Sequence, residues 1–465
     1  MVMAITPVRN FNLVVPLANE ATAMRVADTD GLDTHVWSSA VSPLIGSGLR
    51  RGDVDSTKGR STLTTNLMPG VRISTTAIRT TTTRTTSLEL VPSADQYERP
   101  HADFSLEELL QAYYDCRRTK RNSASALAFE INLERNLIQL RDELVASTYR
   151  PGTSICFVIT RPKPREVWAA DFRDRIVHHL LYNRISPRFY ASFIADSCAC
   201  IPGRGTLYGA QRLESKIRSI TQNWSRQAYY LKLDLANFFV SIDKNILRGL
   251  IAKKVTEPWC LWLADTILFH DPRLDFELRG DPAKIDLVPA HKRLANHPAD
   301  RGLPIGNLSS QFFANIYLNE LDQFIKHKIG ARHYVRYVDD MVILHQSPEW
   351  LNAAKAEIEG FLCDRLNARI NPKKTILQPV DRGVDFVGQV IKPWRRVTRK
   401  RTVNAAMRRV ATMPAGDLFE TANSFFGLFR QASKSHYHQA KLANILRYRG
   451  HTIKGDLTKT YRRSI

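Results

Sequence analysis

The 465-residue sequence predicts a mixed α/β (α+β) fold in which helices accompany an antiparallel sheet. Two strand-like runs at 229–234 and 335–344 predict the sheet, because both are rich in apolar and aromatic residues. The second run contains two adjacent acids, which strands disfavour, so a tight hairpin is expected there. Helical spacing of apolar residues after position 104 and over 312–321 is the third observation.

The first hundred residues differ from the remainder of the chain. Residues 74–87 are a low-complexity run of Thr, Ser and Arg, and residues 38–67 are rich in Gly, Ser and Thr with little periodicity. Such a composition cannot bury a sizeable core. Residues 1–100 are therefore expected to be mostly disordered, or an upstream extension of uncertain start. The alternative is a small partner-binding module.

Globular patterning begins near residue 104. The run Ser-Leu-Glu-Glu from Ser105 predicts a capped helix. A second helix is expected over about 129–145, extended strands over 154–168 around two prolines, and a further helix over about 172–185. The apolar positions that suit one face of the first helix are Leu109, Leu110, Tyr113 and Tyr114.

Three acids belong to the two strand-like runs: Asp234, Asp339 and Asp340. Two-metal phosphoryl transfer needs carboxylates from separate strands that converge, so that ions roughly 3.5–4 Å apart can clamp the attacking and leaving oxygens. An ordinary solvated turn is the alternative for an isolated Asp-Asp pair. Asp243 is a weaker candidate, because its surroundings also predict a helix N-cap.

A glycine-bearing loop and a helical apolar period lie between these acids, at residues 302–322. Gly306 permits a close backbone approach, and the helix start after it is a natural place to hold a nucleotide or a template base. The order of this loop between the two acid motifs makes the pattern specific. Just upstream, residues 270–300 carry Pro, Asp, His and Gly without a clear period, which predicts an exposed insertion.

With these motifs in this order, the chain resembles a reverse transcriptase. Residues 386–389 resemble the primer-grip hairpin, residues 371–375 the lysine motif before it, and residues 161–179 the two fingers motifs. The resemblance covers roughly residues 104–460. It implies an RNA-directed DNA polymerase with a right-hand fold, in which fingers and palm occupy 101–392, with an antiparallel sheet and the 270–300 insertion, and a basic helical thumb occupies 393–465.

Within that family, the loop residues Ile305, Ser310 and Gln311 depart from the common pattern. Together with residues 196–206 and 315–318 they resemble the enzymes of diversity-generating retroelements. A small apolar side chain at 305 in place of an amide would remove a hydrogen-bonding group beside the nascent base pair and lower discrimination. The alternative is a neutral packing residue of this branch.

The resemblance implies a role for each acid. Asp234 and Asp339 would ligate two Mg²⁺ ions, with Mn²⁺ as an alternative, and Asp340 would add charge and a looser contact. The backbone carbonyl of Leu235 is a further candidate ligand. The metals would activate the primer 3′-hydroxyl for in-line displacement, so no protein nucleophile is required. Lys374 is the candidate proton donor to pyrophosphate, with its neighbour Lys373 as the rival.

Nucleotide-binding residues follow in the same way. Arg165 and Arg175 match positions that contact the triphosphate, and Lys163 is a further candidate. Phe239 aligns with the aromatic steric gate that excludes a 2′-hydroxyl, with a core residue as the alternative. The loop residues expected beside the nascent pair are Ile305, Gly306 and Gln311. His178 and His179 point about 100° apart on a helix, so they are assigned to template contact or structure rather than to a metal.

The composition agrees with a nucleic-acid enzyme. The chain has 67 Lys plus Arg against 45 Asp plus Glu, a net charge of +22, which favours a polyanionic partner. Residues 393–465 hold 16 basic and 3 acidic residues, so the expected thumb is the electrostatic clamp.

Of the six cysteines, only Cys198 and Cys200 are close in sequence, which is poor zinc spacing. With no signal peptide and no membrane-length apolar run, a cytoplasmic location without membrane contact is expected.

Three functions remain open at this point. The first is error-prone cDNA synthesis in a diversity-generating retroelement, with a template RNA, a primer and a small basic accessory protein as partners. The second is a related bacterial reverse transcriptase in antiphage defence or a retron-like element. The third is a catalytically idle scaffold that binds RNA. The sequence leaves the template, the priming mode, the error spectrum and the oligomeric state open.

Overall fold

The computed structural model describes residues 23–27, 33–37, 100–118, 123–161, 163–433 and 435–461. The prediction of disorder or a small module over residues 1–100 lies almost entirely outside them. Within that region the described backbone is a two-stranded antiparallel hairpin, β1 (Ala23–Ala27) and β2 (Asp33–Trp37).

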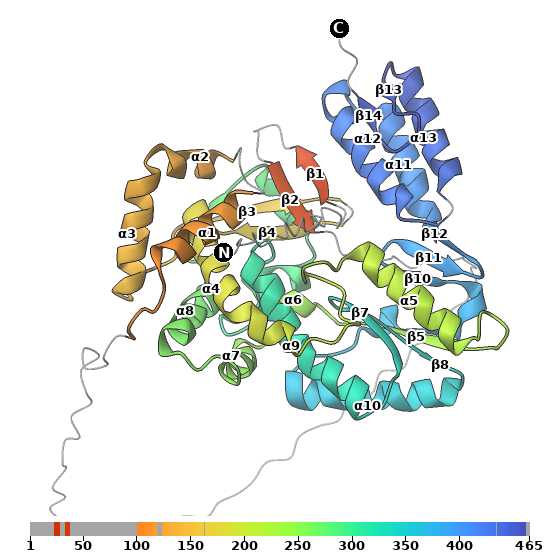
Figure 1. Cartoon of the computed structure of the whole chain (residues 1–465), viewed down its shortest axis with the longest axis horizontal. Helices are drawn as coiled ribbons and strands as arrows, with labels where there is room; N and C mark the ends of the chain where they lie inside the picture. Colours follow the sequence, from red (N-terminus) through yellow and green to blue (C-terminus); the bar gives the residue numbers. More distant parts are fainter. Residues whose placement is uncertain are drawn as a thin grey trace, which may run out of the picture. The chain divides into compact units, whose positions relative to one another are not determined.

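The first helical layer is built around α4 (Phe172–Tyr190), which packs against α1 (Leu106–Arg117) (Figure 1). The predicted cap is confirmed: Ser105 and Glu108 form a reciprocal capping box. Leu109 and Tyr113 are buried as expected, whereas Tyr114 is exposed. The single helix predicted over 129–145 is wrong in detail, because the non-helical backbone of Asn132 divides it into α2 (Ala124–Ile131) and α3 (Leu133–Val145).

A three-stranded sheet follows, in the order β4-β3-β6. The predicted extended stretch forms the antiparallel pair β3 (Ser154–Ile159) and β4 (Arg165–Ala169). The third strand, β6 (Phe276–Leu278), pairs in parallel with β3 and comes from the segment expected to be an exposed insertion. Residues 270–300 are mostly exposed, as expected, but residues 276–278 pair with β3, so this part of the segment belongs to the sheet.

The central sheet has the antiparallel order β7-β8-β5-β9. Its inner pair, β5 (Tyr229–Asp234) and β8 (Asp340–His345), is flanked by β7 (His333–Tyr337) and β9 (Ile376–Pro379). Alternate residues enter two different cores, as strand geometry requires. Leu231 and Met341 belong to the larger core, while Tyr230 and Val342 belong to the smaller one.

Helices cover the two faces of this sheet (Figure 1). The larger core contains buried residues of α9 (Leu308–His327) and α10 (Pro348–Leu366), and the smaller core contains those of α5 (Thr206–Ile220). The connection after β5 holds α6 (Phe238–Ser241), α7 (Lys244–Ala252) and α8 (Pro258–Phe269).

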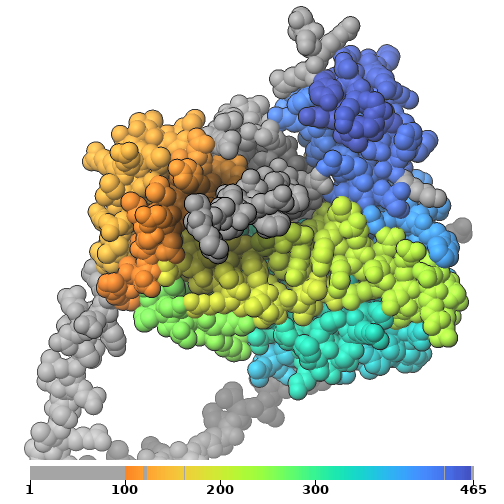
Figure 2. Space-filling view, in the orientation of Figure 1, coloured from red at the N-terminus to blue at the C-terminus, as the bar shows by residue number. Residues whose placement is uncertain are grey.

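The C-terminal segment has its own apolar core. A three-stranded antiparallel sheet precedes it, formed by β10 (Val384–Phe386), β11 (Gln389–Lys392) and β12 (Arg395–Thr398). Three helices then pack together: α11 (Lys400–Thr412), α12 (Ala415–Arg430) and α13 (His436–Tyr448). A short hairpin, β13 (Thr452–Ile453) and β14 (Thr460–Tyr461), ends the described chain. Figure 2 shows this segment in blue.

None of the helices in the described part of the chain combines the length and the apolar character needed to cross a bilayer.

Candidate active site

The three predicted acids meet at one end of the central sheet. Asp234 is the last residue of β5 and lies directly opposite Asp340, the first residue of β8. Directly opposed residues of an antiparallel pair lie on the same face, so the two carboxylates are neighbours. Asp339 occupies the two-residue turn between β7 and β8, beside Val338, whose φ is +54°. The predicted tight hairpin is confirmed.

Burial and the charges of neighbouring acids raise the pKa of Asp339 and Asp340. The pKa of Asp339 rises from 3.8 to about 7, first because of burial and then because of the charges on Asp234 and Asp340. Burial also raises the pKa of Asp340, against the opposing effect of Lys232, whose Nζ lies 3.0 Å from Asp340 Oδ2. Burial therefore favours the neutral form of Asp339 and Asp340 over the ionised form.

One lysine contacts the acids from a neighbouring segment. Lys374 Nζ lies 2.6 Å from Asp234 Oδ1, at the end of the 3₁₀ turn Pro372–Lys374. This turn is fixed to β5, since the backbone N–H of Asn371 donates to the carbonyl of Asp234 at 2.7 Å. Lys373 makes no such contact with the acids among the described interactions, so the geometry favours Lys374 over its rival.

The acids suit a divalent cation chemically. Over the described residues, no three His, Cys, Asp or Glu side chains form a ready-made metal site. Asp340 Oδ1 is nevertheless buried without a hydrogen-bond partner in the described structure, and carboxylate oxygens are the ligands that Mg²⁺ and Mn²⁺ accept. A bound cation would stabilise the ionised form of these carboxylates.

Leu235, the candidate carbonyl ligand, continues the line of β5 towards Ile370. Two backbone bonds flank it: Asn371 N–H donates to the Asp234 carbonyl, and Ala236 N–H donates to the Arg369 carbonyl. The carbonyl of Leu235 itself takes part in neither bond. Its position beside Asp234 is compatible with the predicted role.

The predicted steric gate lies just beyond this point. Asn237 adopts a left-handed conformation with φ +50° and leads into α6. Phe238 is buried in the core, whereas Phe239 is half-buried. The carbonyl of Phe239 accepts the N–H of Leu303 at 2.8 Å, which fixes α6 to the loop before α9. Phe239 is thus the aromatic residue of the pair that remains accessible beside the acids.

The fingers residues divide into two groups. Arg165 begins β4, and the pKa of the nearby Lys163 is lowered first by partial burial and then by Lys374, Lys292 and Arg165. Lys163 therefore lies within electrostatic range of Arg165 and of Lys374, the lysine that is paired with Asp234. Arg175 lies elsewhere: its Nε donates to the Ala170 carbonyl at 2.7 Å, and burial lowers its pKa. No described contact joins Arg175 to the acids.

The glycine loop docks onto β4. The Ile305 carbonyl accepts the N–H of Trp168 at 2.7 Å. Gly306 has φ +134°, and a Cβ there would lie 2.8 Å from the Trp168 carbonyl oxygen. The expected close approach at Gly306 is therefore made to the protein's own strand. Gln311 Oε1 accepts a weak bond from Cys200 Sγ at 3.3 Å, which joins the loop helix to residues 196–206.

The structure also shows the surroundings of Asp243 and of the two adjacent histidines. Asp243 caps α7, because its side chain accepts the backbone N–H groups of Asn245 and Ile246, so its structural interpretation is confirmed. His178 Nδ1 lies 3.2 Å from Ser309 Oγ in the core. Burial lowers the pKa of His178 to about 3 and that of His179 to about 4, so both are neutral near pH 7.

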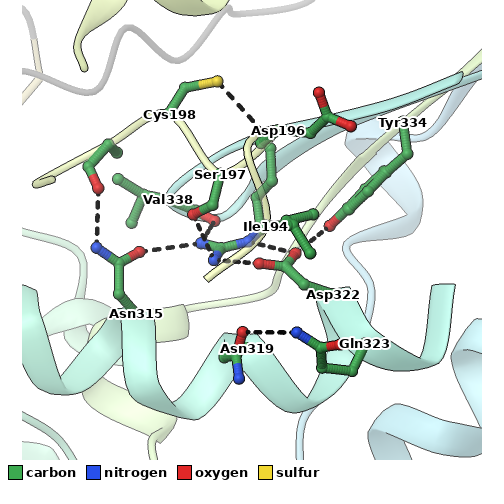
Figure 3. Close-up of polar contacts among 12 residues, drawn as sticks. Ile194, Asp196, Ser197, Cys198, Asn315, Asn319, Asp322, Gln323, Tyr334 and Val338 are labelled. Carbon is green, nitrogen blue, oxygen red and sulfur yellow. Dashed lines mark hydrogen bonds and ion pairs between the residues drawn. The ribbon is translucent and has the colours of Figure 1, made fainter. Parts of the chain in front are cut away.

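Sequence reasoning missed the buried polar cluster beneath the hairpin (Figure 3). Arg336, fully buried, donates to both carboxylate oxygens of Asp322, at 2.8 and 2.6 Å. It also donates to Ser197 Oγ, Asn315 Oδ1 and the carbonyl of Val338 in the acid-bearing turn. An arginine within an apolar strand is the signal that could have revealed this cluster. Lys232 was also missed, although it shares a strand face with Asp234 by the two-residue period.

With this geometry established, residues 161–391 match the family described as reverse transcriptase (RNA-dependent DNA polymerase). These residues, just under half of the chain, are therefore similar to the reverse transcriptase family, and the mixed α/β fold with antiparallel sheets agrees with the right-hand fold predicted from the sequence.

Several known proteins are similar. Protein YkfC of Escherichia coli (strain K12) is 22% identical over 309 residues, which cover 59% of this chain and 74% of YkfC. Nuclear intron maturase 1, mitochondrial, of Arabidopsis thaliana is 23% identical over 297 residues, covering 47% of this chain and 40% of the maturase.

Two solved telomerase structures also align, each at 12% identity. The enzyme from Candida albicans aligns with a TM-score of 0.39 over 64% of this chain and 56% of its own. The apo enzyme from Candida Tropicalis aligns at 0.40 over 52% and 53%. This chain thus spans less than two thirds of the maturase and of both telomerase chains.

Proposed function

We propose that this protein copies an RNA template into DNA with two Mg²⁺ ions held by Asp234, Asp339 and Asp340. The observation that carries the proposal is the meeting of these acids, from β5 and the β7–β8 turn, beside Lys374. The ions would lower the pKa of the primer 3′-hydroxyl and neutralise charge on the phosphates.

The remaining site residues act on the nucleotide. Lys163 and Arg165, which lie within electrostatic range of Lys374, would bind the triphosphate, while Arg175, inside the fingers helix, would support that surface indirectly. Phe239 would exclude a 2′-hydroxyl by its ring. Lys374, held beside Asp234, would give a proton to the departing pyrophosphate. Leu235 would add its carbonyl to the metal ligands.

Primer extension on an RNA template tests the catalytic assignment. Asp339→Asn should lower kcat roughly a thousandfold, which corresponds to about 4 kcal/mol of barrier. Asp364→Asn, an exposed acid on α10, is the matched control and should extend the primer normally. Equal activity of the two variants would overturn the metal-site proposal. An inactive wild-type chain that still binds RNA would support the idle-scaffold alternative.

We also propose that the cDNA synthesis is error-prone and serves a diversity-generating retroelement. Ile305 supports this, because its backbone is fixed by Trp168 while its side chain offers no hydrogen bond beside the loop that precedes α9. Ile305→Gln should lower misincorporation about threefold to tenfold, the effect of one modest hydrogen bond. Ile305→Leu, which keeps an apolar side chain, is the control. An unchanged error spectrum in Ile305→Gln would contradict the proposal.

The partners proposed are a template RNA, a DNA primer and an accessory protein, in a reducing cytoplasm that suits the six free cysteines. Sequencing the cDNA that copurifies with the protein separates the two biological roles. Copies of a template repeat with clustered mismatches would support diversity generation. Accurate copies of an unrelated RNA would favour antiphage defence or a retron-like element.

A further inference from the structure

The segment between α8 and the glycine loop is held firmly on the fingers side. Arg279 N–H donates to the Cys156 carbonyl at 2.8 Å, which extends the β3–β6 pairing. Leu294 N–H donates to Glu166 Oε2 at 2.9 Å, and Glu166 is buried next to Arg165 in β4. This segment therefore has a fixed place beside the strand that carries Arg165.

The same segment is fastened on the palm side. Lys244 N–H donates to the Asp300 carbonyl at 3.0 Å, and Gly302 N–H donates to the Ile242 carbonyl at 2.8 Å. Leu294 packs into a small apolar cluster with Cys156 and Trp168 from the fingers sheet and Val240 from α6. The segment thus forms a wall that joins β4 to the helix of Phe239.

Lys292 lies on this wall, in the 3₁₀ turn Ala290–Lys292, two residues before the buried anchor Leu294. Its side chain is largely exposed and has no hydrogen bond or ion pair within the described structure. The pKa of Lys292 is lowered first by partial burial, then by the charges of Lys374 and Arg165, and is raised by Asp234. Lys292 is therefore electrostatically coupled to both the fingers cations and the acids.

Four cations from three separate segments lie within electrostatic range of one another: Lys163, Arg165, Lys292 and Lys374. Lys374 is paired with Asp234, whereas the charges of Lys163, Arg165 and Lys292 repel one another, and a bound anion would reduce that repulsion. A triphosphate carries several charges that such a group can share, and lysine binds phosphate as a mobile point charge. The acids below would take the metal that accompanies it.

We infer that Lys292 is a further triphosphate-binding residue, supplied to the nucleotide site by the 270–303 wall rather than by the fingers motifs. The inference rests on the proposed polymerase function and extends it to a segment that the sequence suggested was a peripheral insertion.

Single-nucleotide extension at saturating template–primer tests this inference. Lys292→Ala should raise the KM for the deoxynucleotide about tenfold, the effect expected for one charge-assisted hydrogen bond, with kcat changed less than about twofold. Lys292→Arg should keep most of the affinity. The matched control is Lys284→Ala, a lysine of the same segment in the turn Pro282–Leu287, which should behave as the wild type.

Two further measurements make the result decisive. The affinity for template–primer should be equal in all variants, and equal thermal melts should show that the exposed substitution leaves the fold intact. An unchanged KM in Lys292→Ala, or a weaker template–primer affinity with an unchanged KM, would overturn the inference, the latter in favour of a nucleic-acid contact. Equilibrium binding of a deoxynucleoside triphosphate with Ca²⁺ gives the same comparison if the wild type extends no primer, so failure of catalysis and failure of this binding role remain distinguishable.

Discussion

Burial and the neighbouring acids disfavour the ionised form of Asp339. Its pKa in the folded chain is about 7, against an ordinary value of 3.8. The folded state therefore binds this proton more tightly than the unfolded state does. The resulting stabilisation is fully present below about pH 4 and is lost as the pH rises through about 7.

Asp339→Asn, which is neutral at every pH, should therefore stabilise the metal-free fold at pH 8 but not at pH 4. The expected gain is at least about 1 kcal/mol, because one pKa unit corresponds to about 1.4 kcal/mol. Thermal melts in a chelator at the two pH values measure it, with Asp364→Asn as the control. A gain of equal size at both pH values would contradict the electrostatic explanation.

Arg336 lies on β7, the first strand of the hairpin that carries Asp339. Its ion pair with Asp322 is fully buried, and Tyr334 Oη also donates to Asp322 at 2.7 Å (Figure 3). Arg336→Met should cost about 3–5 kcal/mol of unfolding free energy, because it leaves a buried carboxylate without its charge partner.

Adding Asp322→Asn to Arg336→Met should recover part of that loss, since the stranded charge is then removed as well. Urea unfolding of the wild type, both single variants and the double variant measures the coupling. Additive losses would show that the two side chains contribute independently, contrary to the geometry of the pair.

At the scale of elements, local patterns predicted local structure. The capping box of α1 and the hairpin at Asp339 are both specified by residues a few positions apart, and both are confirmed. The break at Asn132 was missed because both flanking runs are helical in pattern. The pairing of β6 with β3 was missed for another reason: it joins residues about 120 positions apart, and three residues carry no period of their own.

In the candidate site, too, residues in local motifs could be predicted, whereas residues placed by long-range contacts could not. Asp234, Asp339 and Asp340 could be found because each stands at a strand end and because their order matches a known family. Lys292 carries no local signal, since only the long-range anchors Glu166 and Leu294 bring it beside Arg165. The acids could be predicted because short sequence motifs contain them. The position of Lys292 could not, because it depends on contacts between residues far apart in the sequence.

The glycine loop offers a test of element docking. An added Cβ at Gly306 would meet the Trp168 carbonyl at 2.8 Å and Val167 Cγ1 at 2.9 Å, in a backbone conformation with φ +134°. Gly306→Ala should therefore destabilise the protein by about 1–3 kcal/mol. Gly360→Ala in α10, where a Cβ would meet nothing within 4 Å, should instead stabilise it by up to about 1 kcal/mol. Urea unfolding compares the two, and equal effects would contradict the docking of this loop on β4.

At the scale of the whole molecule, the positive charge is concentrated where a nucleic acid would lie. Arg401 and Arg408 are exposed on α11, seven residues apart and so on one face of the helix. The charge of Arg401 also contributes to lowering the pKa of Lys163, after burial and the nearer cations.

The double variant Arg401→Ala/Arg408→Ala should weaken template–primer binding for every sequence, because phosphate contacts carry no base information. In a plot of log affinity against log salt, the slope should become less steep by about 1.8, or about 0.9 for each lost contact with a duplex. Lys328→Ala/Arg365→Ala removes the same charge from exposed positions at the ends of α9 and α10 and is the control. If both double variants change the slope equally, net charge rather than a thumb surface governs binding, whereas a change confined to the α11 pair would assign the clamp to this helix.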